Sequence, residues 1–155
     1  MGVNSNEIDI FRDSPVRYLG YANEVGEAFR SLVKKVFVHA SYGVAIAYVL
    51  VDTGDKAKKQ YDKPELLGGG VRPAFVAAGD TLLWQMFASV IIPGLTINRI
   101  CWATAQGLKA AKFPRSPARL WAPTIIGLAS IPLIIHPIDN FVHMLMDKSY
   151  RKYVR

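Results

Sequence analysis

Three stretches of the chain contain no Asp, Glu, Lys or Arg, and nearly all of their residues are apolar. They are residues 36–51, 81–98 and 120–138. The hydrocarbon core of a bilayer is about 30 Å thick, which a helix of roughly 17–25 apolar residues can cross. We therefore predict three membrane-spanning helices at about residues 36–51, 74–98 and 120–138, with Asp80 inside the second.

Two amphipathic segments flank these predicted spans. Apolar side chains recur at alternating spacings of three and four residues over 15–35, after a Ser14–Pro15 helix start. This pattern predicts a helix that either lies in the membrane interface or packs on the bundle. Its candidate interfacial face carries Tyr18, Val25, Phe29 and Leu32. A second apolar stripe predicts another amphipathic helix over 138–150.

The remaining segments define the predicted boundaries. The polar residues 1–14 are expected to be flexible, and residues 52–72, with Pro64 and a triple glycine, to form a loop. The Pro93–Gly94 pair is expected to kink or end the second span. Residues 100–112 are moderately apolar and leave a fourth span open. Residues 15–155 are thus predicted to be a single all-α domain, an integral membrane helical bundle with three or four transmembrane helices.

Charge changes this picture only in detail. The formal net charge is +7, but the basic residues flank apolar segments instead of forming one stripe, so membrane headgroups are a better counter-charge than nucleic acid. Residues 99–119 contain five basic residues and no acid, which places that loop on the more negative side of the membrane. With three spans, the N-terminal region shares this side, and the C-terminus lies opposite.

Few side chains form a pattern that indicates a functional site. Asp80 lies about 9 Å inside the second span by helical rise, where an ionised carboxylate needs a partner. His136 ends the third span on the same side, so an Asp80–His136 contact is geometrically possible. It would be either a proton- or ion-linked site or one hydrogen bond between helices; alternatively, Asp80 lies near the headgroups. His39, Asn98 and Arg99 form a similar candidate group at the opposite face.

Metal and catalytic sites are not expected. The residues His136, Asp139, His143 and Asp147 could share a helical face, but they are also the polar side of the 138–150 stripe. The single cysteine excludes an intramolecular disulfide and a thiolate cluster. No nucleophile, nucleotide or zinc motif is present. We predict a protein that is not an enzyme, with no cofactor and no metal.

Four blocks of sequence resemble the mitochondrial fission process protein family, in the family's order. They are residues 12–33, 41–45, 92–99 (IPGLTINR) and 131–139 (IPLIIHPID). The resemblance implies a multi-pass protein of the mitochondrial inner membrane, associated with mitochondrial division, network morphology and sensitivity to apoptosis. It also implies a link to energy coupling through the adenine nucleotide carrier, and it places the 99–119 loop in the matrix.

Three classes of function therefore remain open. The first is a membrane protein that promotes fission, through its amphipathic segments or through contacts with other inner-membrane proteins. The second is a regulator of ion or proton leak, which would require a homo-oligomer, because one chain with three spans is small for a pore. The third is an accessory subunit of an inner-membrane complex.

Overall fold

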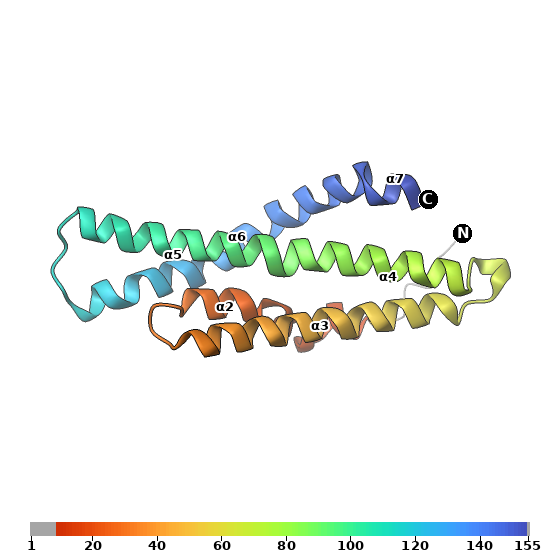
Figure 1. Cartoon of the computed structure of the whole chain (residues 1–155), viewed down its shortest axis with the longest axis horizontal. Helices are drawn as coiled ribbons and strands as arrows, with labels where there is room; N and C mark the ends of the chain where they lie inside the picture. The colour runs from red at the N-terminus through yellow and green to blue at the C-terminus, as the bar shows by residue number, and fades with distance from the viewer. Residues whose placement is uncertain (1–8, 155) are drawn as a thin grey trace.

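The fold is a bundle of long helices, seen in a computed structural model that describes residues 9–154 (Figure 1). No strand occurs among these residues. In chain order the elements are α1 (Ile10–Asp13), the 3₁₀ helix η1 (Pro15–Tyr21), α2 (Ala22–Ala28), α3 (Lys35–Tyr61), the 3₁₀ helix η2 (Glu65–Leu67), α4 (Val71–Gln85), the π-helix η3 (Met86–Ile91), α5 (Ile92–Ala110), α6 (Pro117–Lys148) and α7 (Tyr150–Val154). The all-α prediction is confirmed.

Three helical segments are long and apolar enough to cross a membrane: Lys35–Tyr61, Val71–Ala110 and Pro117–Val154. Most of residues 100–112, the candidate fourth span, continues the second of these segments as part of α5, which ends at Ala110. Only 28%, 17% and 17% of the most apolar window of each segment is buried inside the chain. Most of this apolar surface therefore faces outward, which is the arrangement expected of a bundle solvated by lipid.

Each long helix extends beyond its predicted span. The loop predicted at 52–72 is wrong over its first half, because α3 continues to Tyr61. Ion pairs one turn apart, Lys56–Asp52 at 2.9 Å and Lys59–Asp55 at 2.7 Å, support the helix there. Likewise α6 continues to Lys148, so the amphipathic segment predicted at 138–150 is mainly an extension of the third span.

Proline does not end these helices. Pro123, Pro132 and Pro137 all lie within α6. In the second segment, the predicted break at Pro93–Gly94 is replaced by the π-helical turn of η3, after which α5 begins. A proline ring clashes with the carbonyl one turn earlier in an ordinary helix, and the wider π turn directly before Pro93 relieves that clash.

The N-terminal segment folds back into the bundle. Residues 15–35 are not one helix: η1 and α2 are separate elements, and a turn joins α2 to α3. Phe11 packs edge-on against Tyr48, and Gly26 lies against Ser41, so the segment runs antiparallel beside α3 (Figure 1). The structure therefore favours the bundle-packing alternative for 15–35. Residues 1–8 of the segment predicted to be flexible lie outside the described residues, and residues 10–13 form α1.

Two small clusters of buried apolar residues meet at η3. One contains Ala45, Tyr48 and Val49 of α3 with Val90. The other contains Ile138, Val142 and Met146 of α6 with Ala88. Because Val90 and Ala88 both belong to η3, the π turn joins the two halves of the core.

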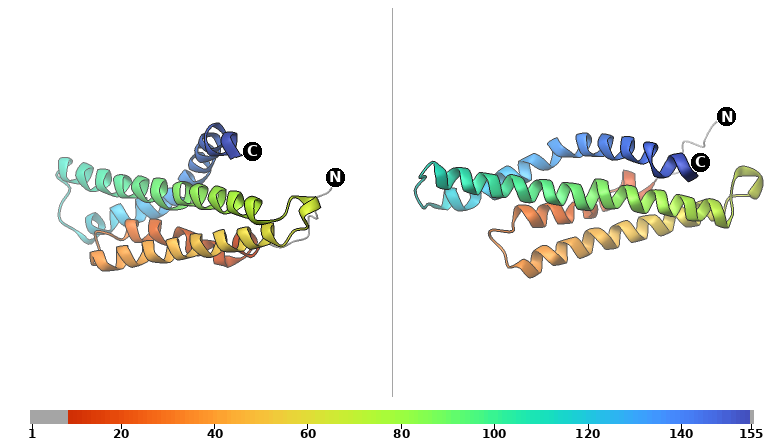
Figure 2. Two further views of the ribbon diagram at one scale, coloured as in Figure 1. Left: turned by 45° about the vertical axis from the view of Figure 1, so that its right-hand side comes forward. Right: turned by 45° about the horizontal axis from the view of Figure 1, so that its top comes forward.

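Both ends of the described chain lie toward the α3–α4 connection. Asp9 forms an ion pair with Lys56 near the end of α3, at 2.8 Å. The Tyr150 hydroxyl donates to the Val76 carbonyl near the start of α4, at 3.1 Å. Figure 2 shows α7 alongside α4 at this end. The prediction that the N-terminal region and the C-terminus lie on opposite sides is therefore wrong, because the N-terminal segment returns into the bundle.

Candidate functional site

Helix α2 turns its polar side inward. Asn23 and Glu24 are completely buried and Glu27 is 3% exposed. The predicted interfacial face points the other way: Tyr18 is 67% and Val25 41% exposed, while Phe29 and Leu32 are half-buried. An outward apolar face over a polar interior suits contact with lipid or with an apolar partner. Of the four residues predicted for this face, Tyr18 and Val25 are thus exposed, and the four lie on two elements and a turn.

Glu27 is the centre of a buried network. Its carboxylate accepts two hydrogen bonds from the Arg30 guanidinium, both at 2.7 Å. The Tyr42 hydroxyl donates to it at 2.9 Å and the Asn98 amide at 3.0 Å. Burial opposes ionisation of Glu27, but the hydrogen bonds from Arg30, Asn98 and Tyr42 outweigh it and lower its pKa. One carboxylate therefore joins α2, α3 and α5.

The carboxyl group of Glu24, unlike that of Glu27, is buried without hydrogen bonds. Neither of its carboxylate oxygens has a hydrogen-bond partner, and both are inaccessible. Burial, with a smaller contribution from the negative charge of Asp139, raises the pKa of Glu24 to about 8. The side chain is therefore neutral over much of the physiological pH range, which makes a buried carboxyl without a counter-ion tolerable.

The raised pKa of Glu24 predicts that the stability of the fold depends on pH. Its ordinary pKa is 4.5 and its folded-state pKa about 8, so between these values the folded chain retains a proton that the unfolded chain releases. This contribution to stability is fully present below pH 4.5 and is lost as the pH rises to 8. We expect Glu24→Gln to flatten the fall in thermal stability between pH 5 and 8, measured in detergent micelles. Glu65→Gln, at an exposed site, should leave the fall unchanged; equal curves for wild type and Glu24→Gln would contradict the assignment.

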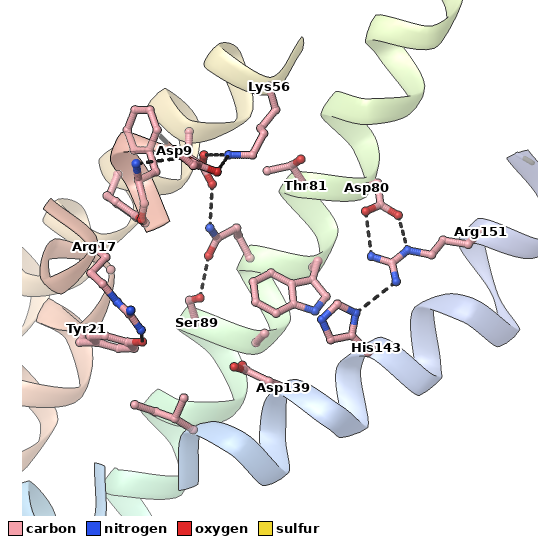
Figure 3. Close-up of a pocket in the computed structure, with 18 residues that line it drawn as sticks. Asp9, Arg17, Tyr21, Lys56, Asp80, Thr81, Ser89, Asp139, His143 and Arg151 are labelled. Atoms are coloured by element: carbon pink, nitrogen blue, oxygen red, sulfur yellow. Dashed lines mark hydrogen bonds and ion pairs between the residues drawn. The ribbon is translucent and has the colours of Figure 1, made fainter. Parts of the chain in front are cut away.

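A polar cavity of about 520 Å³ lies between the N-terminal segment, α3, α4 and α6 (Figure 3). A chain of hydrogen bonds follows one wall. Lys56 donates to Asp9 at 2.8 Å and to Asp52 at 2.9 Å. Gln85 donates to the other Asp52 oxygen at 2.8 Å and accepts from Ser89 at 2.7 Å. The N-terminal segment, α3, α4 and η3 are thereby linked by polar contacts inside the bundle.

Asp80 lies on another wall of this cavity and pairs with Arg151. The guanidinium donates to both carboxylate oxygens, at 2.6 and 2.9 Å, and also contacts His143 at 3.2 Å (Figure 3). It donates to Asp147 as well, at 2.9 Å. The candidate Asp80–His136 contact is therefore not formed, because Arg151 occupies Asp80 and His136 is exposed on α6. The partner of Asp80 is instead Arg151, which belongs to α7.

The three residues of the other candidate polar group do not lie together in the structure. Asn98 reaches the Glu27 network, whereas His39 and Arg99 are exposed. Sequence reasoning missed Asp52, Lys56, Gln85 and Arg151 as interior groups. The spacing of four residues between Asp52 and Lys56, and between Asp147 and Arg151, was the available signal. Among residues 9–154, no group of three or more His, Cys, Asp or Glu side chains is placed to hold a metal ion.

The sequence matches the family described as mitochondrial 18 kDa protein (MTP18) over residues 6–67 and 71–146. This match includes both α2 and the cavity residues up to His143. The chain belongs to this family. Among its relatives are proteins named mitochondrial fission process protein 1, and the fission-family resemblance seen in the sequence is confirmed.

Three of these MTP18 relatives show how much of the chain is shared. The Caenorhabditis elegans protein is 54% identical over 146 residues, covering 93% of this chain and 87% of the relative. The Homo sapiens protein is 53% identical over 146 residues, covering 94% and 88%. The Danio rerio protein is 49% identical over 149 residues, covering 96% and 90%. No solved structure matches this member of the MTP18 family.

Proposed function

We propose that this chain is a multi-pass protein of the mitochondrial inner membrane that promotes mitochondrial division without catalysing a reaction. The observation that carries the proposal is the match along nearly the whole chain to relatives named mitochondrial fission process protein 1. Three apolar helices whose most apolar windows are mainly unburied support a position within a membrane. The inner membrane is the location that the family resemblance implies.

The outward apolar face of the N-terminal segment is the surface we assign to this function. Tyr18 and Val25 are exposed there, on elements whose opposite side carries the buried Glu24 and Glu27. Such a face contacts acyl chains or the apolar surface of another membrane protein, and a charge on it disfavours both contacts. The interior charges described here, by contrast, are occupied with one another: Lys56 with Asp52, and Arg151 with Asp80. They support a structural role, so a leak pathway is not proposed.

A charge on this face is expected to reduce fission. In cells whose own family member has been deleted, the wild-type chain should restore the number of mitochondria per cell. Val25→Lys should restore less than half of the difference, at equal protein level and with unchanged membrane insertion. Ser31→Lys adds the same charge at an exposed position off the face and should restore fully. Full restoration by Val25→Lys would contradict the assignment.

Apoptosis sensitivity is part of the same proposal. The family resemblance links division to the response to apoptotic stimuli, and the deleted cells are the place to test that link. Cells expressing Val25→Lys should release cytochrome c at the rate of deleted cells, and cells expressing Ser31→Lys at the rate of cells with the wild-type chain. Contact with the adenine nucleotide carrier, which the resemblance also implies, would appear as co-purification from the same cells.

The topology can be tested separately from the function. Because Asp9 and Tyr150 both lie toward the α3–α4 connection, tags at the two ends of the chain should share one side of the membrane. We expect protease to leave both tags intact in whole mitochondria and to treat them alike after the outer membrane is ruptured. One tag cleaved and the other protected in ruptured mitochondria would contradict the return of the N-terminal segment. Cleavage in intact mitochondria would contradict the inner-membrane location.

A further inference from the structure

A second cavity, of about 860 Å³, lies between the end of α3, the start of α4 and α7. Five basic side chains and a single acidic one line it. The basic residues are Lys56, Lys59, Lys63, Arg72 and Arg151, and the acidic residue is Asp80. A concave surface with this charge attracts anions.

The cations of this cavity are not equally available. Lys56 pairs with Asp9 and Asp52, Lys59 with Asp55, and Arg151 with Asp80 and Asp147. Lys63 donates to the Gln60 amide oxygen, at 3.0 Å, and to no carboxylate among residues 9–154. Arg72 is exposed and forms no ion pair within the described part of the chain. Among the described residues, Lys63 and Arg72 are therefore the two cations of this cavity without a carboxylate partner.

The wall formed by α7 is fixed in place. The Tyr150 hydroxyl binds the Val76 carbonyl, and the ring lies so close to Gly79 that a Cβ there would stand 2.3 Å from the hydroxyl oxygen. Next to it, Arg151 binds Asp80 through two hydrogen bonds. These contacts hold α7 against α4, so the cavity exists before any ligand arrives.

The rest of the lining is apolar and belongs to segments that can cross a membrane. Pro73, Val76 and Ala77 of α4 and Val154 of α7 provide this part. The cavity lies at the ends of these segments, where the headgroups of a bilayer would be. A site with free cations beside an apolar wall at this level suits an amphiphile with an anionic head. We propose that this cavity binds the phosphate group of an anionic lipid, with Lys63 and Arg72 as its contacts.

Each contact has a distinct role in this site. The planar guanidinium of Arg72 can donate two parallel hydrogen bonds to phosphate oxygens, and the Lys63 ammonium adds a second positive charge. The acyl chain then lies along Val76 and Ala77. A soluble phosphate ester shares the phosphate chemistry but gains nothing from the apolar wall, so the two sources of phosphate can be separated by experiment.

The test uses the full chain purified in a neutral detergent. Phosphatidylglycerol and phosphatidylcholine share a phosphodiester and differ in net charge, so they are the two lipid probes. We expect phosphatidylglycerol to remain bound in native mass spectrometry and to raise the unfolding temperature, and phosphatidylcholine to do neither. Lys63→Glu with Arg72→Glu should weaken phosphatidylglycerol binding at least tenfold. Lys109→Glu with Arg115→Glu, the same change of charge at exposed positions by the other turn, should alter it less than twofold.

Three results would overturn the proposal. Equal weakening by both pairs of substitutions would show only a general attraction between charges. Equal binding of phosphatidylcholine would remove the requirement for an anionic lipid. A rise in unfolding temperature with glycerol phosphate as large as with phosphatidylglycerol would make the site one for soluble phosphate esters. If the Lys63→Glu and Arg72→Glu pair loses helical circular dichroism, Lys63→Gln with Arg72→Gln is judged by the same tenfold criterion.

Discussion

Replacing Glu27 by leucine is expected to lower the free energy of unfolding by about 2–4 kcal/mol, the larger of the effects on stability predicted here. The change removes the acceptor for Tyr42 and Asn98, whose buried donors then lack a partner. The loss of the Arg30 ion pair adds less, because that guanidinium side chain is 37% exposed and can be hydrated. Unfolding by a denaturing detergent, followed by circular dichroism, measures the difference.

A matched substitution distinguishes the effect of breaking the Glu27 hydrogen bonds from the effect of removing a negative charge. Glu65 is exposed in η2, so Glu65→Leu removes the same charge without breaking a buried contact and should cost less than about 0.5 kcal/mol. Glu27→Gln keeps one acceptor and should fall between the two. If Glu27→Leu and Glu65→Leu are equally stable, Glu27 does not join the three helices.

Placing a side chain on Gly26 is expected to be the second largest perturbation. A Cβ there would stand 1.9 Å from the Ser41 Oγ and 2.8 Å from its Cβ. Ser41 cannot easily turn away, since its hydroxyl donates to the Val38 carbonyl at 2.6 Å. Gly26→Ala should therefore push α2 away from α3 and cost about 1–3 kcal/mol, measured by the same unfolding assay.

Two further variants test the cause of this loss. Ser41→Gly clears the space and should recover part of the stability in the double variant, a departure from additivity that residues in contact produce. Gly43→Ala is the matched control, because nothing lies within 4 Å of a Cβ at Gly43. Its replacement in α3 should be neutral or slightly stabilising, since alanine favours helix more than glycine does. A similar loss for Gly26→Ala and Gly43→Ala would contradict the close contact.

The three long helices could be predicted because a long run of apolar residues can be recognised in a sequence without knowledge of the tertiary contacts. The ends of these helices could not be predicted, because a group of charged residues after an apolar run usually indicates a loop. Here Asp52, Asp55, Lys56 and Lys59 neutralise one another one turn apart and extend α3. The sequence also does not predict that the helix passes Pro93, because the π turn that accommodates this proline has no signature in a single sequence.

The interior contacts were harder to predict for a different reason. Asp80 and Arg151 are 71 positions apart, and only the return of α7 onto α4 brings them together. The sequence shows the amphipathic pattern of residues 15–35 but not which face of the segment packs on the bundle. An apolar face packs against the protein core in water, whereas in a membrane it can equally contact lipid. In the structure Glu24 and Glu27 are buried, so the polar side of α2 faces the bundle.

The π turn at Met86–Ile91 gives the second long segment a rotational offset. One extra residue in a turn shifts the phase of the following helix by about 100° relative to an uninterrupted one. The part before the turn can therefore present Gln85 to Asp52 while the part after it presents Asn98 to Glu27, each with its own alignment. If the wide turn moved along the segment, only the residues that it passes would rotate, by about 100° each, while the two ends of the segment would keep their relative orientation and the backbone hydrogen bonds would be exchanged one at a time.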